Sequence, residues 1–134
     1  MFIARRWPGR GPGNLTLRVV RPQPGISIIR ARGLLDRRAA PGLHRVLNEQ
    51  LAASWAVLLD LRALADLEPG AVPALVCAAG SAAHGDVGFY LVSASARLHR
   101  VLATAGVDEM FEVHSSTESA LRVVRDGPSA PAPR

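Results

Sequence analysis

The sequence contains one cysteine, no lysine and few aromatic residues. Cys77 has no second cysteine to pair with, which excludes an internal disulfide and is typical of a protein in a reducing cytosol. We expect Cys77 to be a small buried hydrophobe. No apolar run approaches the roughly 18 residues of a membrane helix, and residues 1–10 lack the apolar segment of a secretory signal. These absences predict a cytoplasmic protein.

Residue sets that would support catalysis are also missing. The four histidines stand apart, without a carboxylate or cysteine at metal-ligand spacing; they are His44, His84, His99 and His114. No glycine-rich phosphate loop and no G-x-S-x-G string occurs. Asp60, Asp66 and Glu68 lie close in sequence, but we interpret Asp60 as the end of a strand and the other two as favourable charges near a helix N-terminus. We therefore predict no enzyme activity, no metal and no cofactor.

Positive charge is concentrated at the front of the chain. Residues 1–38 carry nine arginines and one acid, whereas residues 39–134 carry seven arginines and ten acids. A basic arm of this kind is most often solvated, and binding to nucleic acid or to an acidic partner is the alternative. The 134 residues suffice for one domain. We predict a flexible Arg/Gly/Pro leader over 1–13, a domain over 14–125 and a disordered tail over 126–134.

Apolar patterning predicts alternating strands and helices. Strands are expected at Leu15–Val20, Ile26–Arg32, Trp55–Leu61, Asp86–Val92 and Phe111–Val113, and helices at Arg37–Ala53, Ala71–Ala83, Ser95–Ala105 and Thr117–Val124. The first two strands are joined by a short turn and should be antiparallel, while a helix joins the second to the third, which should be parallel. The order β-β-α-β-α-β-α-β-α predicts an α/β fold with a mixed sheet of about five strands and about four helices.

The stretch Trp55–Val76 is the centre of this arrangement. Its first part, up to Leu61, is apolar except for Asp60, which indicates a strand covered on both faces, with Leu59 buried. A turn is expected over Arg62–Leu67. A regular helix beginning at Pro69 would lack the hydrogen bond from residue 73 to residue 69, because Pro73 has no N–H. We therefore expect the second helix to begin near Val72–Pro73, after an irregular Glu68–Ala71.

Helix ends are marked by short polar side chains and glycine. Asp36 is placed to cap or anchor the turn before the first helix, and Ser93 or Ser95 to cap the third. Gly106 is expected just beyond the end of the third helix. Ser115–Glu118 has the pattern of a capping box, which predicts the start of the last helix.

Five strings, in order along the chain, resemble the STAS domain of bacterial anti-sigma factor antagonists of the stage II sporulation type. They are Gly33–Asp36 (GLLD), Val57–Leu61 (VLLDL), Phe89–Val92 (FYLV), Leu98–Phe111 and Ser116–Leu121. The resemblance covers about Leu15 to Arg125. It implies a single STAS-like domain that works by docking to another protein.

The resemblance also identifies the residues of a switch that is altered here. In these antagonists, D-S-[ST]-G follows the central strand, and a partner kinase that is also the anti-sigma factor phosphorylates its first serine. The corresponding places, counted from Asp60, hold Glu68, Pro69, Gly70 and Ala71. Proline has no hydroxyl, and no Ser, Thr or Tyr lies between Trp55 and Ser81. Glu68 supplies one negative charge against about two on a phosphate, so it is a poor mimic.

The resemblance implies a docking surface formed by Gly33–Asp36, Arg62–Ala71 and Ser93–Arg97. Its expected partner-binding residues are Asp36, Glu68, Pro69, Gly70, Ala71, Ser93 and Ser95. The expected partner is an anti-sigma factor or a protein with a histidine-kinase-like ATPase domain. A divergent relative acting as an accessory subunit, a homodimer or a small-ligand sensor is the second interpretation. Neither a membrane nor nucleic acid is expected as the partner.

Overall fold

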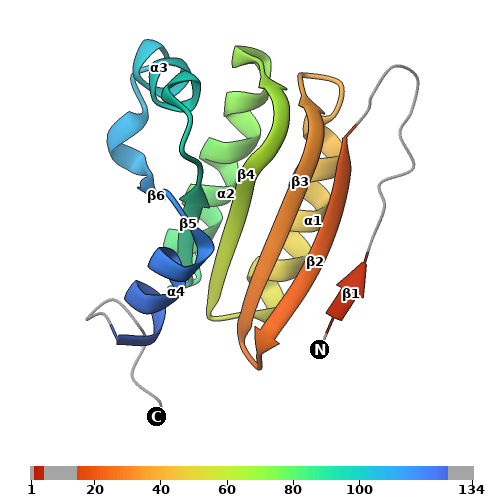
Figure 1. The fold of residues 1–134 in the computed structure, drawn as a ribbon, viewed down its shortest axis with the longest axis vertical. Coiled ribbons are helices and arrows are strands. Elements are labelled where there is room, and N and C mark those ends of the chain that lie inside the picture. Colours follow the sequence, from red (N-terminus) through yellow and green to blue (C-terminus); the bar gives the residue numbers. More distant parts are fainter. Residues whose placement is uncertain (1, 5–14, 127–134) are drawn as a thin grey trace.

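The computed structural model describes residues 2–4 and 15–126 (Figure 1). Its strands are β1 (Phe2–Ala4), β2 (Thr16–Gln23), β3 (Ile26–Leu35), β4 (Ala56–Leu67), β5 (Gly88–Val92) and β6 (Glu112–His114). Its helices are α1 (Ala40–Ala53), α2 (Val72–His84), α3 (Ala96–Thr104) and α4 (Thr117–Asp126), with 3-10 turns η1 (Pro69–Ala71) and η2 (Asp108–Met110). The predicted order of elements is confirmed from β2 to α4.

The strands form one mixed sheet in the order β1-β2-β3-β4-β5-β6. β2 is antiparallel to β1 and β3, whereas β3, β4, β5 and β6 run parallel, as predicted for the second and third strands of the domain. The sixth strand, β1, lies within the segment expected to be a flexible leader, and it pairs Phe2–Ala4 with Arg18–Val20. The rest of that leader and residues 127–134 of the expected tail lie outside the described residues.

Helices cover the two faces of the sheet unequally. α1, α2 and α3 pack on one face and build the larger apolar cluster, which includes Leu43, Leu75 and Leu102. In Figure 1, α1 and α2 lie behind the sheet and α4 lies in front of it. α4 contributes Ala120 and Val124 to a smaller cluster on that opposite face. Much of the front face over β2 and β3 is therefore left without a helix among the described residues (Figure 1).

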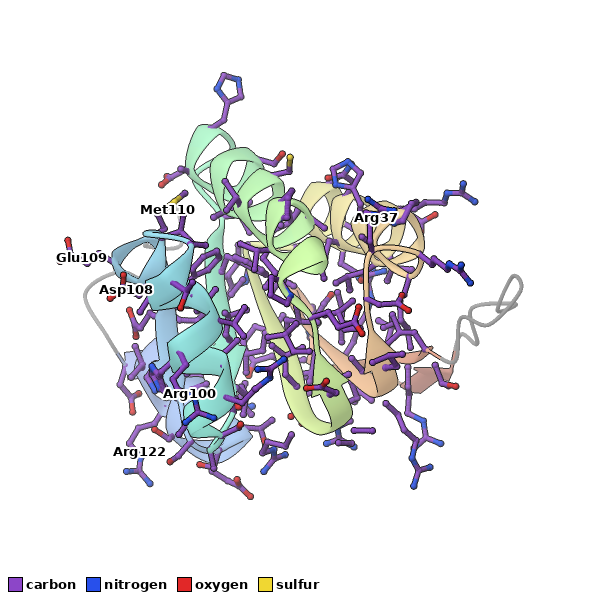
Figure 2. The ribbon with its side chains drawn as sticks, turned by 90° about the horizontal axis from the view of Figure 1, so that it is seen from above. Arg37, Arg100, Asp108, Glu109, Met110 and Arg122 are labelled. Atoms are coloured by element: carbon purple, nitrogen blue, oxygen red, sulfur yellow. The ribbon has the colours of Figure 1, made fainter. Side chains whose placement is uncertain are left out.

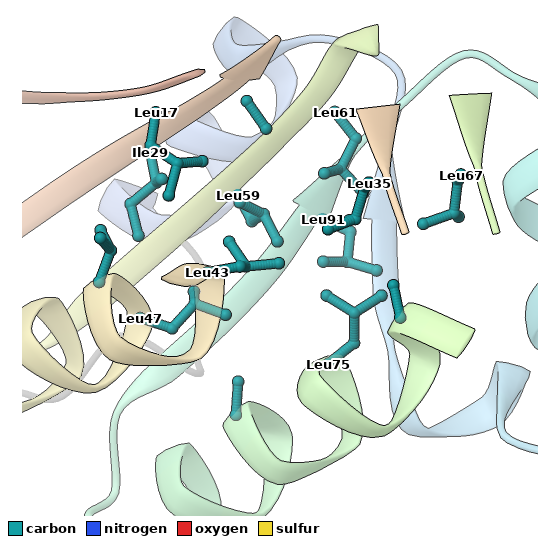
Figure 3. Packing of buried hydrophobic residues seen from close by; sticks show 14 of the residues in the cluster. Leu17, Ile29, Leu35, Leu43, Leu47, Leu59, Leu61, Leu67, Leu75 and Leu91 are labelled. Atoms are coloured by element: carbon teal, nitrogen blue, oxygen red, sulfur yellow. The ribbon is translucent and has the colours of Figure 1, made fainter. Parts of the chain in front are cut away.

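β4 is the buried centre of the sheet, as its apolar sequence predicted. Leu59 is 0% exposed and faces the helices with Leu61, next to Ile29 of β3 and Leu91 of β5 (Figure 3). Leu58 lies on the other face, in the cluster with α4. Burial on both faces explains why strand residues in this region do not alternate between apolar and polar.

The predicted turn over 62–67 is wrong, because β4 continues as a strand to Leu67. β3 lengthens in parallel with it, so that Gly33 pairs with Leu64 and Leu35 with Leu67, across two register shifts. Leu67 is buried and Leu64 partly buried against the core, which stabilises the extension. Asp60 consequently lies within β4 rather than at its end.

The start of α2 agrees with the expectation from its prolines. Pro69–Ala71 form the 3-10 turn, and the regular helix begins at Val72. Cys77, in contrast, is exposed rather than buried. The buried positions of α2 include Leu75, Ala78 and Ala82, and a residue two places after Leu75 points well away from that stripe because each residue advances the helix by about 100°. In the described residues, no helix is both long enough and apolar enough to span a bilayer.

Candidate docking surface

The parallel strands β3, β4 and β5 end at one edge of the sheet, at the top of Figure 1. In open α/β sheets, the carboxyl ends of the strands are where binding surfaces form. Two turns meet at this edge, one after β3 and one after β4, and α3 begins beside them.

The turn after β3 is fixed by Asp36. Its Oδ1 accepts a hydrogen bond from the Ala39 N–H at 2.9 Å, and its carbonyl accepts one from Ala40 N–H at 3.1 Å. The predicted anchoring role of Asp36 is confirmed. Because these bonds close the turn, the side chains of Arg37 and Arg38 project into solvent.

The turn after β4 carries Glu68–Ala71. The Glu68 N–H donates to the Leu35 carbonyl at 2.9 Å, which ties this turn to the end of β3. Pro69 is the first residue of η1 and is exposed at the mouth of α2. Ala71, at 0% exposure, belongs to the core, so it shapes the turn and its methyl group does not reach the surface.

These two turns lie against each other. A Cβ added to Gly70 would lie 3.1 Å from the Cβ of Arg37, so the backbone of η1 lies close against the turn that precedes α1. Asp36, Glu68 and Gly70 line one shallow hollow of about 330 Å³ together with Arg37 and Arg38. Three of the residues predicted to bind a partner are thus brought together.

Ser93 and Ser95 order the second part of the surface. Ser93 is buried, and its Oγ accepts a hydrogen bond from the Ser95 N–H at 3.1 Å. Ser95 is exposed, and its Oγ accepts one from the Arg97 N–H at 3.0 Å, which caps α3. Of the two serines predicted as alternatives, Ser95 is therefore the cap. Ser93 shapes the turn from within.

The end of β4 separates the hollow at Gly70 from the serines at the start of α3. Arg97 connects α3 to the end of β4, since its Nε lies 3.1 Å from Oδ1 of Asp66. A second hollow of about 510 Å³ lies there, lined by Leu64, Asp66, Ser95 and Arg97 among others. Asp66 also accepts a hydrogen bond from the Leu67 N–H, so it supports the strand end and the ion pair rather than a helix N-terminus.

Arg62 lines the same hollow and is bound by Asp60. The Nε of Arg62 lies 3.0 Å from Oδ1 of Asp60, and its Nη2 lies 2.9 Å from Oδ2. The backbone N–H of Arg62 also donates to Oδ1, at 3.0 Å. The hydrogen bond to Asp60 raises the pKa of Arg62 above its ordinary value, against the smaller effect of burial. Asp60 and Arg62 are thus a structural pair, and Asp60 is not placed with Asp66 and Glu68 for acid–base chemistry.

In the part of the chain that the structure describes, no group of three or more His, Cys, Asp and Glu side chains could hold a metal ion. The surface instead offers exposed polar side chains and the N-terminus of a helix, which suit recognition of another molecule. Sequence reasoning missed Arg37 and the Asp66–Arg97 pair. Arg97 follows a predicted cap by two residues, but nothing in the sequence indicated how far β4 extends toward it.

Comparisons with known proteins agree with this architecture. The family model of the STAS domain matches residues 18–120. A search of curated protein sequences found no match. An anti-sigma factor antagonist from Mycobacterium paratuberculosis has a similar solved structure, with 24% identity, a TM-score of 0.72, and coverage of 88% of this chain and 100% of that one.

The anti-sigma factor antagonist SpoIIAA is also similar, in two solved forms. Its unphosphorylated form has 15% identity, a TM-score of 0.70, and coverage of 82% of this chain and 96% of that one. The phosphorylated form of this Bacillus cell fate determinant has 15% identity, a TM-score of 0.62, and coverage of 81% and 99%. At these identities the likeness establishes the fold. With the family model spanning most of the sheet and its helices, the chain belongs to the STAS domain family.

Proposed function

We propose that this chain is a non-catalytic docking module of the anti-sigma factor antagonist type that is not switched by phosphorylation at the usual turn. In this proposal it binds an anti-sigma factor, or a protein with a histidine-kinase-like ATPase domain, through the surface around Asp36, Glu68 and Gly70. Its binding regulates transcription in the cytoplasm, a location in keeping with a single unpaired cysteine.

One observation carries the proposal. Pro69 is exposed at the mouth of α2. By the count from Asp60, the resemblance implies that it stands where the antagonists carry their phosphorylated serine. A proline side chain has no oxygen to accept a phosphoryl group. Within the docking surface, the hydroxyls are those of Ser93 and Ser95 at the start of α3, and Ser93 is buried.

The loss of this hydroxyl has a direct physical consequence. A phosphate on the turn would add about two negative charges next to Glu68 and repel an acidic docking partner or clash with an apolar one. Without it, the electrostatics of the turn stay constant whatever the kinase activity in the cell. The module is then continuously available to its partner.

Capture of a partner tests the proposal. The full chain is used as bait, and the affinity of the captured protein is measured by calorimetry for the unmodified chain, Glu68→Arg and Glu49→Arg. Glu49 is exposed on α1, thirteen positions beyond the Asp36 turn, so it makes a charge-matched control. We expect capture of a kinase-fold anti-sigma protein, an affinity loss of about tenfold or more for Glu68→Arg, and a change within about twofold for Glu49→Arg. Equal losses in both variants would count against this surface.

The hollow of about 510 Å³ between β4 and α3 favours a second candidate function, that of a small-ligand sensor. Its volume lies in the range of small-molecule sites, and its wall combines apolar Leu64 and Leu98 with the polar Ser95 and Arg97. Thermal stabilisation by a small ligand, in the absence of any captured kinase-fold protein, would favour this function over the first.

A further inference from the structure

The open face of the sheet carries a compact group of arginines, three of which lie on β2 and β3, away from the docking surface. Leu17, Val19, Ile29 and Ala31 face the helices, so the alternate residues of β2 and β3 face the other way. These include Arg18, Arg30 and Arg32, all exposed. Arg62 of β4 joins them through Asp60, which is the register partner of Arg30. We call these four residues the arginine face.

Helix α4 packs beside the arginine face and not over it, although the charge of its Glu118 acts on Arg62. The α4 residues Ala120 and Val124 pack with Ile26, Ile28 and Leu58, nearer the start of the parallel strands. Arg30 and Arg62 remain 45% and 40% exposed. Solvent therefore reaches the guanidinium groups of the arginine face.

Two of these arginines face each other across neighbouring strands. Arg18 and Arg30 are direct partners across β2 and β3, and like charges opposite each other destabilise an antiparallel pair. The acid within the face, Asp60, is bound bidentately by Arg62, while its contact with Arg30 is 3.9 Å long. Glu118 of α4 also acts on Arg62. The excess of positive charge is therefore centred on β3, at Arg30 and Arg32.

We propose that the arginine face binds an acidic, extended segment of a partner protein. Residues 30 and 32 are two positions apart on one strand, a spacing of about 6.6 Å, and neighbouring strands lie about 4.8 Å apart. An extended peptide with an acid at every second residue presents carboxylates at the same interval of about 6.6 Å. Guanidinium groups bind carboxylates in a two-pronged manner, which an ammonium group does not.

Nucleic acid fits this face less well. Sheets that bind single strands do so with exposed aromatic side chains on which bases stack. The aromatic residues on this side of the described sheet, Trp55 and Tyr90, pack into the cluster beneath α4 instead. The face also has only four guanidinium groups, fewer than a DNA-binding protein that makes roughly 6–10 contacts to phosphates would need.

The inference goes beyond the proposed docking function because three of its four arginines lie outside the docking surface, and Arg62 lines both sites. The docking surface lies at the ends of β3, β4 and β5, whereas Arg18, Arg30 and Arg32 lie along β2 and β3. One partner could be held at the strand ends while an acidic segment, from it or from another protein, lies on the sheet. The two sites can therefore be disabled separately.

A binding titration with model ligands tests the proposal. Fluorescence anisotropy is measured for a labelled peptide of alternating Asp and Ser, for the matched Asn/Ser peptide, and for a single-stranded oligonucleotide of the same charge as the acidic peptide. The proteins are the full chain, the double variant Arg30→Gln/Arg32→Gln, and the control Arg45→Gln/Arg100→Gln. The control removes the same charge from exposed positions on α1 and α3, and Figure 2 shows Arg100 on α3. Circular dichroism checks that each variant is folded.

We expect the acidic peptide to bind, the neutral peptide not to bind, and added salt to weaken the complex. Arg30→Gln/Arg32→Gln should lower the affinity for the acidic peptide by about fivefold or more, with the control within about twofold of the unmodified chain. Glu68→Arg should leave this affinity unchanged, which separates the result from that for the docking surface. Equal losses in the two double variants, tighter binding of the oligonucleotide, or no binding of the acidic peptide at low salt would each overturn the proposal.

Discussion

Arg97 and Asp66 form an ion pair between the first turn of α3 and the end of β4, with Nε 3.1 Å from Oδ1. Both side chains are 46% exposed, so the pair is worth only about 0.2–1 kcal/mol of stability. Its importance is positional. It joins the hollow beside α3 to the strand end from which the turn at Pro69 emerges.

Arg97→Gln should therefore affect binding more than folding. We expect the free energy of unfolding to fall by less than about 1 kcal/mol, because an exposed ion pair is screened by solvent. Affinity for the captured partner should fall by about threefold or more, as the pair no longer fixes the edge of the surface. Arg100→Gln, on the same helix and exposed, is the control and should change neither quantity appreciably. Unchanged affinity in Arg97→Gln would show that the surface does not extend to α3.

Two exposed glycines should respond to alanine in opposite directions. Gly80 lies inside α2, and a Cβ there would meet nothing within 4 Å, so Gly80→Ala should stabilise the protein by about 0.5–1 kcal/mol. Gly106 has φ +75°, a conformation that alanine adopts only with strain, so Gly106→Ala should destabilise it by about 1 kcal/mol. Urea unfolding of both variants measures the two shifts, and a gain in Gly106→Ala would contradict the backbone described for the end of α3.

Leu59→Asp should unfold the domain. Leu59 is fully buried in β4, and an unpaired carboxylate there should lower stability by more than about 4 kcal/mol, a large part of the total for an ordinary domain. The control, Met110→Asp, places the same charge at a residue that is 49% exposed on η2 (Figure 2), and should cost no more than about 0.5 kcal/mol. A Leu59→Asp protein that unfolds cooperatively at the midpoint of the unmodified chain would refute the position of β4.

The thiol of Cys77 should react in the native protein. It is exposed on the surface of α2, so a disulfide-exchange reagent should modify it without denaturant. Cys77→Ser should abolish the reaction and change stability by no more than about 0.5 kcal/mol. A thiol that reacts only after urea is added would show that Cys77 is buried, as first expected from the sequence, and would contradict its exposure on α2.

The elements that could be predicted from sequence are those with a strong local signal. The apolar stripe of α1, the prolines around the start of α2, and the serine and glycine at the ends of α3 each act within a few residues, and each was interpreted correctly. The capping box of the last helix was predicted less accurately. There the Oγ of Ser116 accepts from the Ser119 N–H, so the cap is Ser116.

What could not be predicted depends on pairing between distant residues. The extension of β4 to Leu67 requires the matching extension of β3, and no local pattern shows that match. β1 pairs through its backbone over three residues, too few for an apolar period to be visible. For the candidate site, Asp36, Glu68 and Gly70 were placed together by resemblance alone, while their contact with Arg37 depends on how two turns fold back toward each other.

Phosphate mapping decides whether the turn at Pro69 lacks a phosphorylation site. The protein is incubated with ATP and the captured partner kinase, its intact mass is measured, and any modified residue is located by peptide mass spectrometry; a Pro69→Ser variant is treated in parallel. We expect no phosphate on residues 55–80 of the unmodified chain and undiminished partner binding, with modification gained only in the Pro69→Ser variant. Stoichiometric phosphorylation of the unmodified protein that abolishes partner binding would contradict it.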